Sequence, residues 1–73
     1  MIQRGLYKHY KGGLYKVICM ATHTETLEDM VVYKDDKENV WVRPATMWNE
    51  IVDTSYGKVR RFTKIKESSK EQE

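Results

Sequence analysis

The sequence contains a single cysteine, a single proline and only four glycines among its 73 residues. One cysteine forms no intrachain disulfide, so Cys19 is expected to be a small buried hydrophobe in a protein of the reducing cytoplasm. No apolar run is long enough to cross a bilayer, and no hydrophobic segment of a signal peptide follows the start of the chain. We therefore expect one small cytoplasmic domain without membrane contact.

The sequence also lacks the motifs of recognised catalytic chemistry. It has no nucleophile motif, no phosphate-binding loop and no cysteine cluster for zinc. His9 and His23 have no third ligand at a fixed spacing, which makes a metal site weakly supported. We expect no metal, no cofactor and no catalytic residue, and an enzyme or ligand sensor built on these histidines and Arg43 ranks last among the functions considered.

Short apolar runs separated by turn residues predict antiparallel β structure. Gly12 and Gly13 supply the positive φ that a tight hairpin turn needs, and Pro44 ends a strand because it has no amide proton. Residues 45–48 are expected to form a helical turn that folds Trp48 back over the preceding hairpin. The predicted strands lie at residues 5–10, 14–22, 30–33, 40–42 and 58–62, with a short extended piece at 49–52.

These elements predict a mainly β fold, a small SH3-like antiparallel barrel of about five strands with one short helical turn. The domain is expected to span residues 1–64, followed by a charged, disordered tail at 65–73. The run 14–22 is apolar on both parities, so we expect it at the centre of the sheet and covered on both faces. The expected core is Val17, Cys19, Val31 or Val32, Val42 and Ile51.

Four motifs in order along residues 5–62 resemble the bacterial domain-of-unknown-function family 1653. They are G-L-Y-K-H-Y-K-G-G-L-Y at 5–15, H-T-E-T-L-E-D-M-V-V-Y at 23–33, W-V-R-P-A-T-M-W at 41–48 and V-R-R-F at 59–62. The chain departs from the family pattern at 34–39, where relatives often carry an aromatic residue. The resemblance implies a compact SH3-like β-barrel and no established activity.

Aromatic, histidine and arginine side chains make a peptide- or protein-binding module the first functional hypothesis. SH3-like barrels dock extended segments in aromatic-lined grooves, and an Arg beside a Trp suits carboxylate or phosphate recognition. If Val40 and Val42 face the core, Trp41 and Arg43 point outward or along a groove. His23 has an alternative role, which is to hydrogen-bond the backbone of a turn with Thr26. The candidate ligand-binding residues are Tyr7, His9, His23, Tyr33, Trp41 and Arg43.

The distribution of charge supports an alternative hypothesis, binding of single-stranded nucleic acid. Residues 1–24 and 54–66 contain only basic charges, +4 and +5, whereas residues 25–39 carry a net charge of −4. If the first and last strands are neighbours, their cations form a basic stripe with aromatic residues among them. The acidic segment 25–39 would repel a phosphate backbone if it lay on the same face as the basic stripe. The candidate residues are Arg4, Lys8, Lys11, Arg60 and Arg61.

Overall fold

The protein was analysed as a computed structural model that describes residues 2–65. Seven strands and one helical turn follow in the order β1 (Gly5–His9), β2 (Leu14–Thr22), β3 (Asp29–Lys34), β4 (Val40–Pro44), α1 (Ala45–Trp48), β5 (Ile51–Thr54), β6 (Gly57–Arg60) and β7 (Phe62–Lys64). No helix within this range is long and apolar enough to span a membrane. Apart from Ile65, the predicted tail lies outside the described residues.

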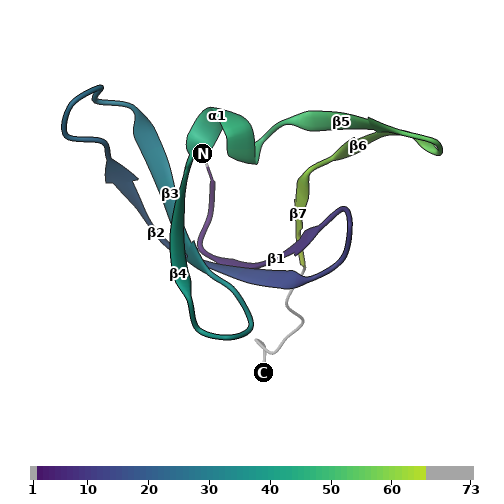
Figure 1. Ribbon diagram of the computed structural model, residues 1–73, viewed down its shortest axis with the longest axis horizontal. Coiled ribbons are helices and arrows are strands. Elements are labelled where there is room, and N and C mark those ends of the chain that lie inside the picture. The colour runs from purple at the N-terminus through teal and green to yellow at the C-terminus, as the bar shows by residue number, and fades with distance from the viewer. Residues whose placement is uncertain (1, 66–73) are drawn as a thin grey trace.

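The strands form a five-stranded antiparallel sheet in the order β4-β3-β2-β1-β7, and β5 and β6 form a separate hairpin. Figure 1 shows the sheet curving around α1, with the β5–β6 hairpin extending to one side. The mainly β fold and the central position of β2 are confirmed, and β1 pairs with β7, of which only Phe62 belongs to the predicted last strand. The sheet stays open, since no pairing among the described residues joins β4 to β7.

The predicted last strand, 58–62, is divided in two at Arg61. The Arg61 amide donates to the Glu50 carbonyl, and the Tyr10 amide donates to the Arg61 carbonyl, both at 2.9 Å. Arg61 therefore links the hairpin to the main sheet through its backbone. Its guanidinium also forms an ion pair with Glu50 at 2.8 Å. These bonds fix the angle at which the hairpin leaves the sheet.

The core is aromatic and lies on the inner, concave face of the sheet. Its buried members are Tyr7, Val17, Val31, Tyr33, Trp48 and Phe62. Trp48 stacks on Phe62 with ring centroids 3.8 Å apart and meets Tyr33 edge-on at 4.9 Å. The helical turn α1 thus supplies the central core residue, because it carries Trp48 back over the sheet as predicted. Aromatic pairs of this kind add stability beyond the area they bury.

The prediction that Cys19, Val42 and Ile51 belong to the core is wrong, because all three side chains are exposed. The register pairs Val32 with Val42 and places both on the outer face, opposite to buried Val31. A bulge between Val17 and Cys19 also shifts the alternation of β2, which leaves Cys19 on the outer face beside Val32. The prediction that both faces of β2 are covered is therefore wrong. Val17 and Val31 are buried as predicted.

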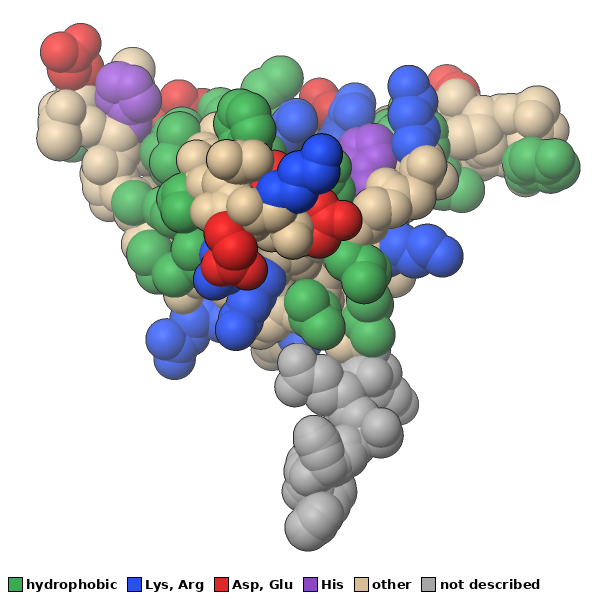
Figure 2. All heavy atoms as spheres, turned by 60° about the horizontal axis from the view of Figure 1, so that its bottom comes forward, with side chains coloured by type: hydrophobic (Ala, Val, Ile, Leu, Met, Phe, Trp, Pro, Cys, Tyr) green, Lys and Arg blue, Asp and Glu red, His purple; other side chains and the backbone are tan. Residues whose placement is uncertain are grey.

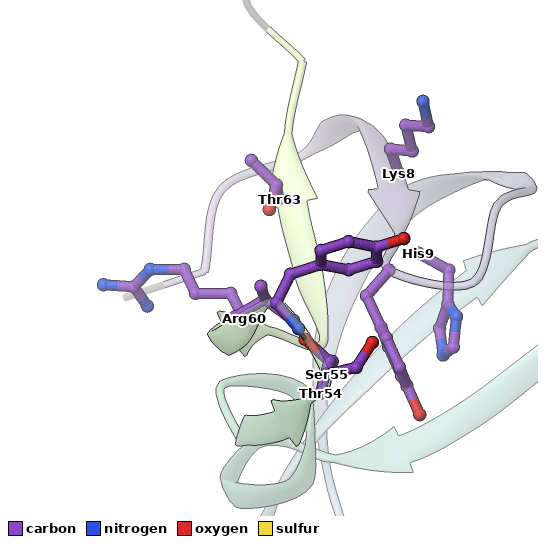
Figure 3. Close-up of a pocket in the computed structure, with 9 residues that line it drawn as sticks. Lys8, His9, Thr54, Ser55, Arg60 and Thr63 are labelled. Atoms are coloured by element: carbon purple, nitrogen blue, oxygen red, sulfur yellow. Dashed lines mark hydrogen bonds between the residues drawn. The ribbon is translucent and has the colours of Figure 1, made fainter.

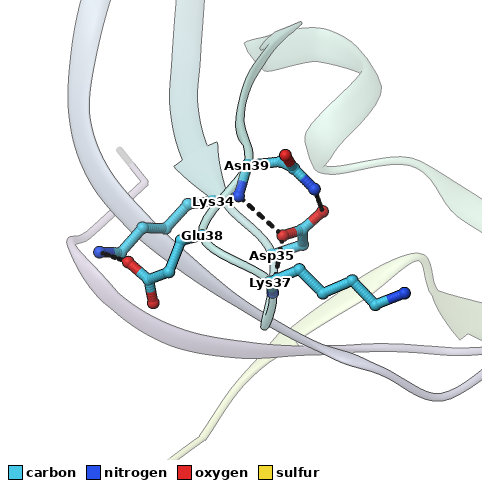
Figure 4. A network of polar contacts seen from close by, with 5 residues as sticks. All are labelled: Lys34, Asp35, Lys37, Glu38 and Asn39. Atoms are coloured by element: carbon cyan, nitrogen blue, oxygen red, sulfur yellow. Dashed lines mark hydrogen bonds and ion pairs between the residues drawn. The ribbon is translucent and has the colours of Figure 1, made fainter.

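The β3–β4 turn is held by Asp35. Its carboxylate accepts the amides of Lys37 at 2.9 Å and Asn39 at 3.0 Å, and the Trp41 indole N–H at 3.0 Å. Figure 4 shows the Lys34–Glu38 ion pair on one side of this turn and the Asp35–Asn39 contacts on the other. The Trp41 bond is the largest of the contacts that hold the pKa of Asp35 at about 2. The acidic segment 34–39 is thus a turn that several hydrogen bonds and one ion pair hold in place.

Candidate functional site

A pocket of about 490 Å³ lies between the end of β1, the β5–β6 hairpin and β7 (Figure 3). The described residues that line it include two cations, a histidine, two tyrosines and three residues with aliphatic hydroxyls, and no carboxylate. The lining residues are Lys8, His9, Tyr10, Thr54, Ser55, Tyr56, Val59, Arg60 and Thr63. The pocket therefore carries positive charge and aromatic surface together.

Tyr56 stands at the tip of the hairpin with 96% of its surface exposed. The tip is ordered by local bonds, since the Tyr56 amide donates to Thr54 Oγ1 at 3.1 Å and the Thr54 hydroxyl donates to the Gly57 carbonyl at 2.7 Å. Gly57 closes the turn at a φ of 114°, a conformation that favours glycine. No other aromatic ring among the described residues packs against Tyr56. Its ring faces are consequently open to a flat ligand.

The two cations of the pocket do not converge. Figure 3 shows Lys8 and Arg60 reaching toward opposite sides, with Thr63 between them. Lys8 comes from β1 and Arg60 from β6, so the hairpin geometry sets their separation. A single compact anion would be held best by cations that point at one place. The observed arrangement suits an elongated anion that crosses the pocket.

His9 lines the same pocket and also borders the core. Its ring lies 4.9 Å from Phe62 and 4.8 Å from Tyr10, and its Nδ1 accepts the Lys11 amide at 3.1 Å. Burial, reinforced by the nearby charges of Arg61, Arg43 and Lys11, lowers the pKa of His9. At neutral pH the imidazole is therefore uncharged, with Nε2 left as its donor.

The aromatic residues proposed as a peptide groove have structural contacts instead. Tyr7 and Tyr33 are each only 7% exposed. The Tyr7 hydroxyl donates to the Gln3 carbonyl at 2.8 Å, and burial raises its pKa. Trp41 is half-exposed and bonded to Asp35. These tyrosines present little surface to a ligand.

Arg43 lies on the inner face, because its register partner is the buried Val31. This reverses the parity expected for β4: the Trp41 and Arg43 face turns toward the core, and the valine face turns outward. The Arg43 guanidinium lies 5.7 Å from the Phe62 ring, a cation–π contact. Arg43 Nε and Trp48 Nε1 are buried without a hydrogen-bond partner among the described residues. Arg43 and His9 thus meet the same ring, Phe62.

His23 lies at the opposite end of β2 from His9. It follows the end of β2, whereas His9 lies beside the start of β2, and that nine-residue strand is about 30 Å long. The His23 Nδ1 accepts the amides of Glu25 at 3.1 Å and Thr26 at 3.3 Å, while the Thr26 hydroxyl donates to Glu28. These bonds agree with the alternative role considered for His23, in which it hydrogen-bonds the backbone of a turn together with Thr26. The four residues His9, His23, Trp41 and Arg43 therefore do not form one site.

Three of the five residues of the predicted basic stripe line two pockets, and the other two lie beside the first pocket. Lys8 and Arg60 line the pocket described above, and Lys11 and Arg61 lie 5.8 and 5.9 Å from the Tyr10 ring beside it. Arg4 lines a second pocket with Lys16 and Lys34. Figure 2 shows Lys and Arg side chains at several places on one face, with exposed hydrophobic groups among them.

Sequence reasoning missed Tyr56. Its signal was present, since an aromatic residue inside the polar run 53–57 has no core to join. Within residues 2–65, no three His, Cys, Asp or Glu side chains are close enough to hold a metal ion.

Comparison with known proteins places the chain in one family. No curated protein matches it. A crystal structure of a protein from Bordetella bronchiseptica that belongs to DUF1653 is similar, with a TM-score of 0.83 and 33% sequence identity over 93% of this chain and 92% of the other. The sequence profile described as "Protein of unknown function (DUF1653)" matches residues 5–64, nearly all of the described structure. The chain therefore belongs to the DUF1653 family.

Proposed function

We propose that this domain binds single-stranded nucleic acid in the pocket between β1 and the β5–β6 hairpin. The observation that carries the proposal is the lining of that pocket, where exposed Tyr56 lies with Lys8 and Arg60 and no carboxylate. Proteins that bind single strands without strong sequence preference combine aromatic platforms for bases with cations along the backbone. The pocket has both components.

The position of the acidic residues agrees with this function. Two of the three acids of the β3–β4 turn are occupied locally, Asp35 by hydrogen bonds within the turn and Glu38 by an ion pair with Lys34. On the hairpin, Asp53 is paired with Lys58 at 2.7 Å. By the alternation of a strand, Asp53 lies on the opposite hairpin face from Val59 but on the same face as Arg60, whose register partner is Ile51; Asp53 itself does not line the pocket. A phosphate backbone in the pocket would meet no carboxylate of its lining.

Fluorescence anisotropy with labelled oligothymidylate and oligouridylate at low salt tests the proposal. Stacking of one base on an aromatic side chain contributes about 1–3 kcal/mol, so Tyr56→Ala should weaken binding by about 5- to 150-fold. The fold should be unchanged, because Tyr56 is 96% exposed.

Met47→Ala is the matched control, since Met47 is also an exposed large side chain but lies on α1 outside the pocket. It should bind like the unmodified protein. Absence of binding to either oligonucleotide, or equal affinity of Tyr56→Ala and the unmodified protein, would refute the proposal.

A peptide or protein partner is the second candidate, favoured by the edge strand β4. Val40, Trp41 and Val42 are consecutive and all more than half exposed. An extended peptide can add to such an edge through backbone hydrogen bonds. Chemical-shift mapping separates the two candidates: an oligonucleotide should perturb the amides around Tyr10 and Tyr56, and an extended peptide with acidic and apolar side chains should perturb Val40–Val42.

A further inference from the structure

The outer face of the sheet carries a second group of cations beside the tyrosine pocket. Because Tyr7 is buried on the inner face, its neighbours Leu6 and Lys8 lie on the outer face. Lys16 pairs with Leu6, and Lys34 pairs with Lys16, so both lysines lie on the outer face too. Lys8 is thereby a diagonal neighbour of Lys16, at a Cα separation of about 7–8 Å.

The pairing of Lys16 with Lys34 is electrostatically unfavourable. Like charges directly opposite each other on neighbouring strands destabilise a sheet. Lys34 is compensated by Glu38 at 2.7 Å, but Lys16 has no ion pair among the described residues. The fold therefore maintains an uncompensated cation at this position. A bound anion would relieve that repulsion.

Lys16 and Lys34 share a pocket of about 480 Å³ with Arg4. Its other lining residues are Gly5, Val17 and Ile18, the last at the β-bulge of β2. Three cations thus surround one hollow, and none of the described residues that line it is a carboxylate. Bulges re-aim side chains next to binding sites, and here the bulge adjoins the cationic hollow.

We infer that the Arg4–Lys16–Lys34 pocket continues the nucleic-acid site, so that a bound strand passes from Tyr56 over Lys8 and sets a phosphate among these three cations. The inference rests on the proposed function. Between the two pockets, Leu6 and Leu14 are 36% and 48% exposed on the outer face, beside Lys16 and Lys8 respectively. Cations for phosphates and apolar surface for sugars and bases therefore alternate along the path.

Two lengths of oligothymidylate test the path. One of about four nucleotides should fill only the tyrosine pocket, and one of about twelve should reach both pockets. Lys16→Gln should leave the affinity for the short oligonucleotide unchanged. It should lower the affinity for the long one by about fivefold at 0.1 M salt and reduce the salt slope by about 0.7, the loss of one phosphate contact. Its melting temperature should not fall, because the substitution removes a like-charge pair.

Lys58→Gln is the matched control, since it removes the same charge from a lysine that is paired with Asp53 and lines neither pocket. It should leave both affinities unchanged. If neither oligonucleotide binds, the proposed function itself is refuted. If both bind but Lys16→Gln has no effect on the long one, or no more effect than Lys58→Gln, the path is refuted while the tyrosine pocket stands.

Discussion

Replacement of Trp48 by alanine should remove most of the stability of this domain. Trp48 is 1% exposed, stacks on Phe62 at 3.8 Å and meets Tyr7 and Tyr33 edge-on at 5.3 and 4.9 Å. A buried Trp→Ala change costs about 3–5 kcal/mol, and aromatic pairs contribute about 0.5–1.5 kcal/mol each beyond burial. The expected stability of a 73-residue chain is about 4–11 kcal/mol. The variant should therefore be barely folded or unfolded.

Urea denaturation followed by circular dichroism measures the effect, because the substitution removes one of two tryptophan fluorophores. For a slope of about 1 kcal/mol per molar urea, the midpoint should fall by about 3 M or more. Trp48→Phe should cost less, about 1–2 kcal/mol, since it keeps a ring on Phe62 and removes an indole N–H that has no hydrogen-bond partner among the described residues.

Met47→Ala is the control from the same helical turn. Met47 is 44% exposed, so its loss should change the unfolding free energy by no more than about 0.5 kcal/mol. If Trp48→Ala shifted the midpoint as little as Met47→Ala does, the aromatic cluster would not be the core of the domain. The role assigned to α1 would then be refuted.

Three further predictions concern the sheet, the acidic turn and His9. Val31→Ala should cost on the order of 1–3 kcal/mol of unfolding free energy while Val42→Ala costs under about 0.5 kcal/mol; equal midpoints in urea would contradict the register. The pKa of Asp35, lowered to about 2 from 3.8, means that its bonds stabilise the fold above about pH 4 and are lost as the pH falls toward 2. The unmodified protein should have a higher unfolding free energy than Asp35→Asn above about pH 4, and this difference should shrink as the pH falls toward 2. A difference that stays constant over this range would contradict the prediction. The lowered pKa of His9 means that its neutral form stabilises the fold above about pH 6.5, an effect lost as the pH falls through its folded pKa. Nucleic acid in the pocket should raise that pKa by offsetting Arg61, Arg43 and Lys11, and an NMR titration that shows the same pKa with and without oligonucleotide would place the ligand elsewhere.

Local signals in the sequence were sufficient for the first four strands, the helical turn and their order. The Gly12-Gly13 turn, the strand over 14–22 and the helical turn over 45–48 all follow from backbone preferences of a few adjacent residues. The division of the last strand at Arg61 did not follow, because it depends on backbone bonds to Glu50 and Tyr10, which are distant in the chain.

The faces of the strands could not be assigned from the pattern alone. In β4, both parities are apolar or aromatic, so the sequence allowed either the valines or Trp41 and Arg43 to face the core. The pairing of Arg43 with buried Val31 decided this, and Val40 and Val42 became outer residues. In β2, the bulge at Ile18 moved Cys19 to the outer face, which no local rule indicates.

The sequence by itself determined the family, the antiparallel β class and the presence of basic residues in both terminal segments, because these depend on composition, local propensity and motif order. Only the tertiary structure decided which side chains share a surface. It buried Tyr7 and Tyr33, separated His23 from His9, and set Tyr56 beside Lys8 and Arg60. The physical reason is that strand register and the angle of the β5–β6 hairpin arise from long-range backbone bonds, and a shift of one residue in register exchanges the two faces of a strand.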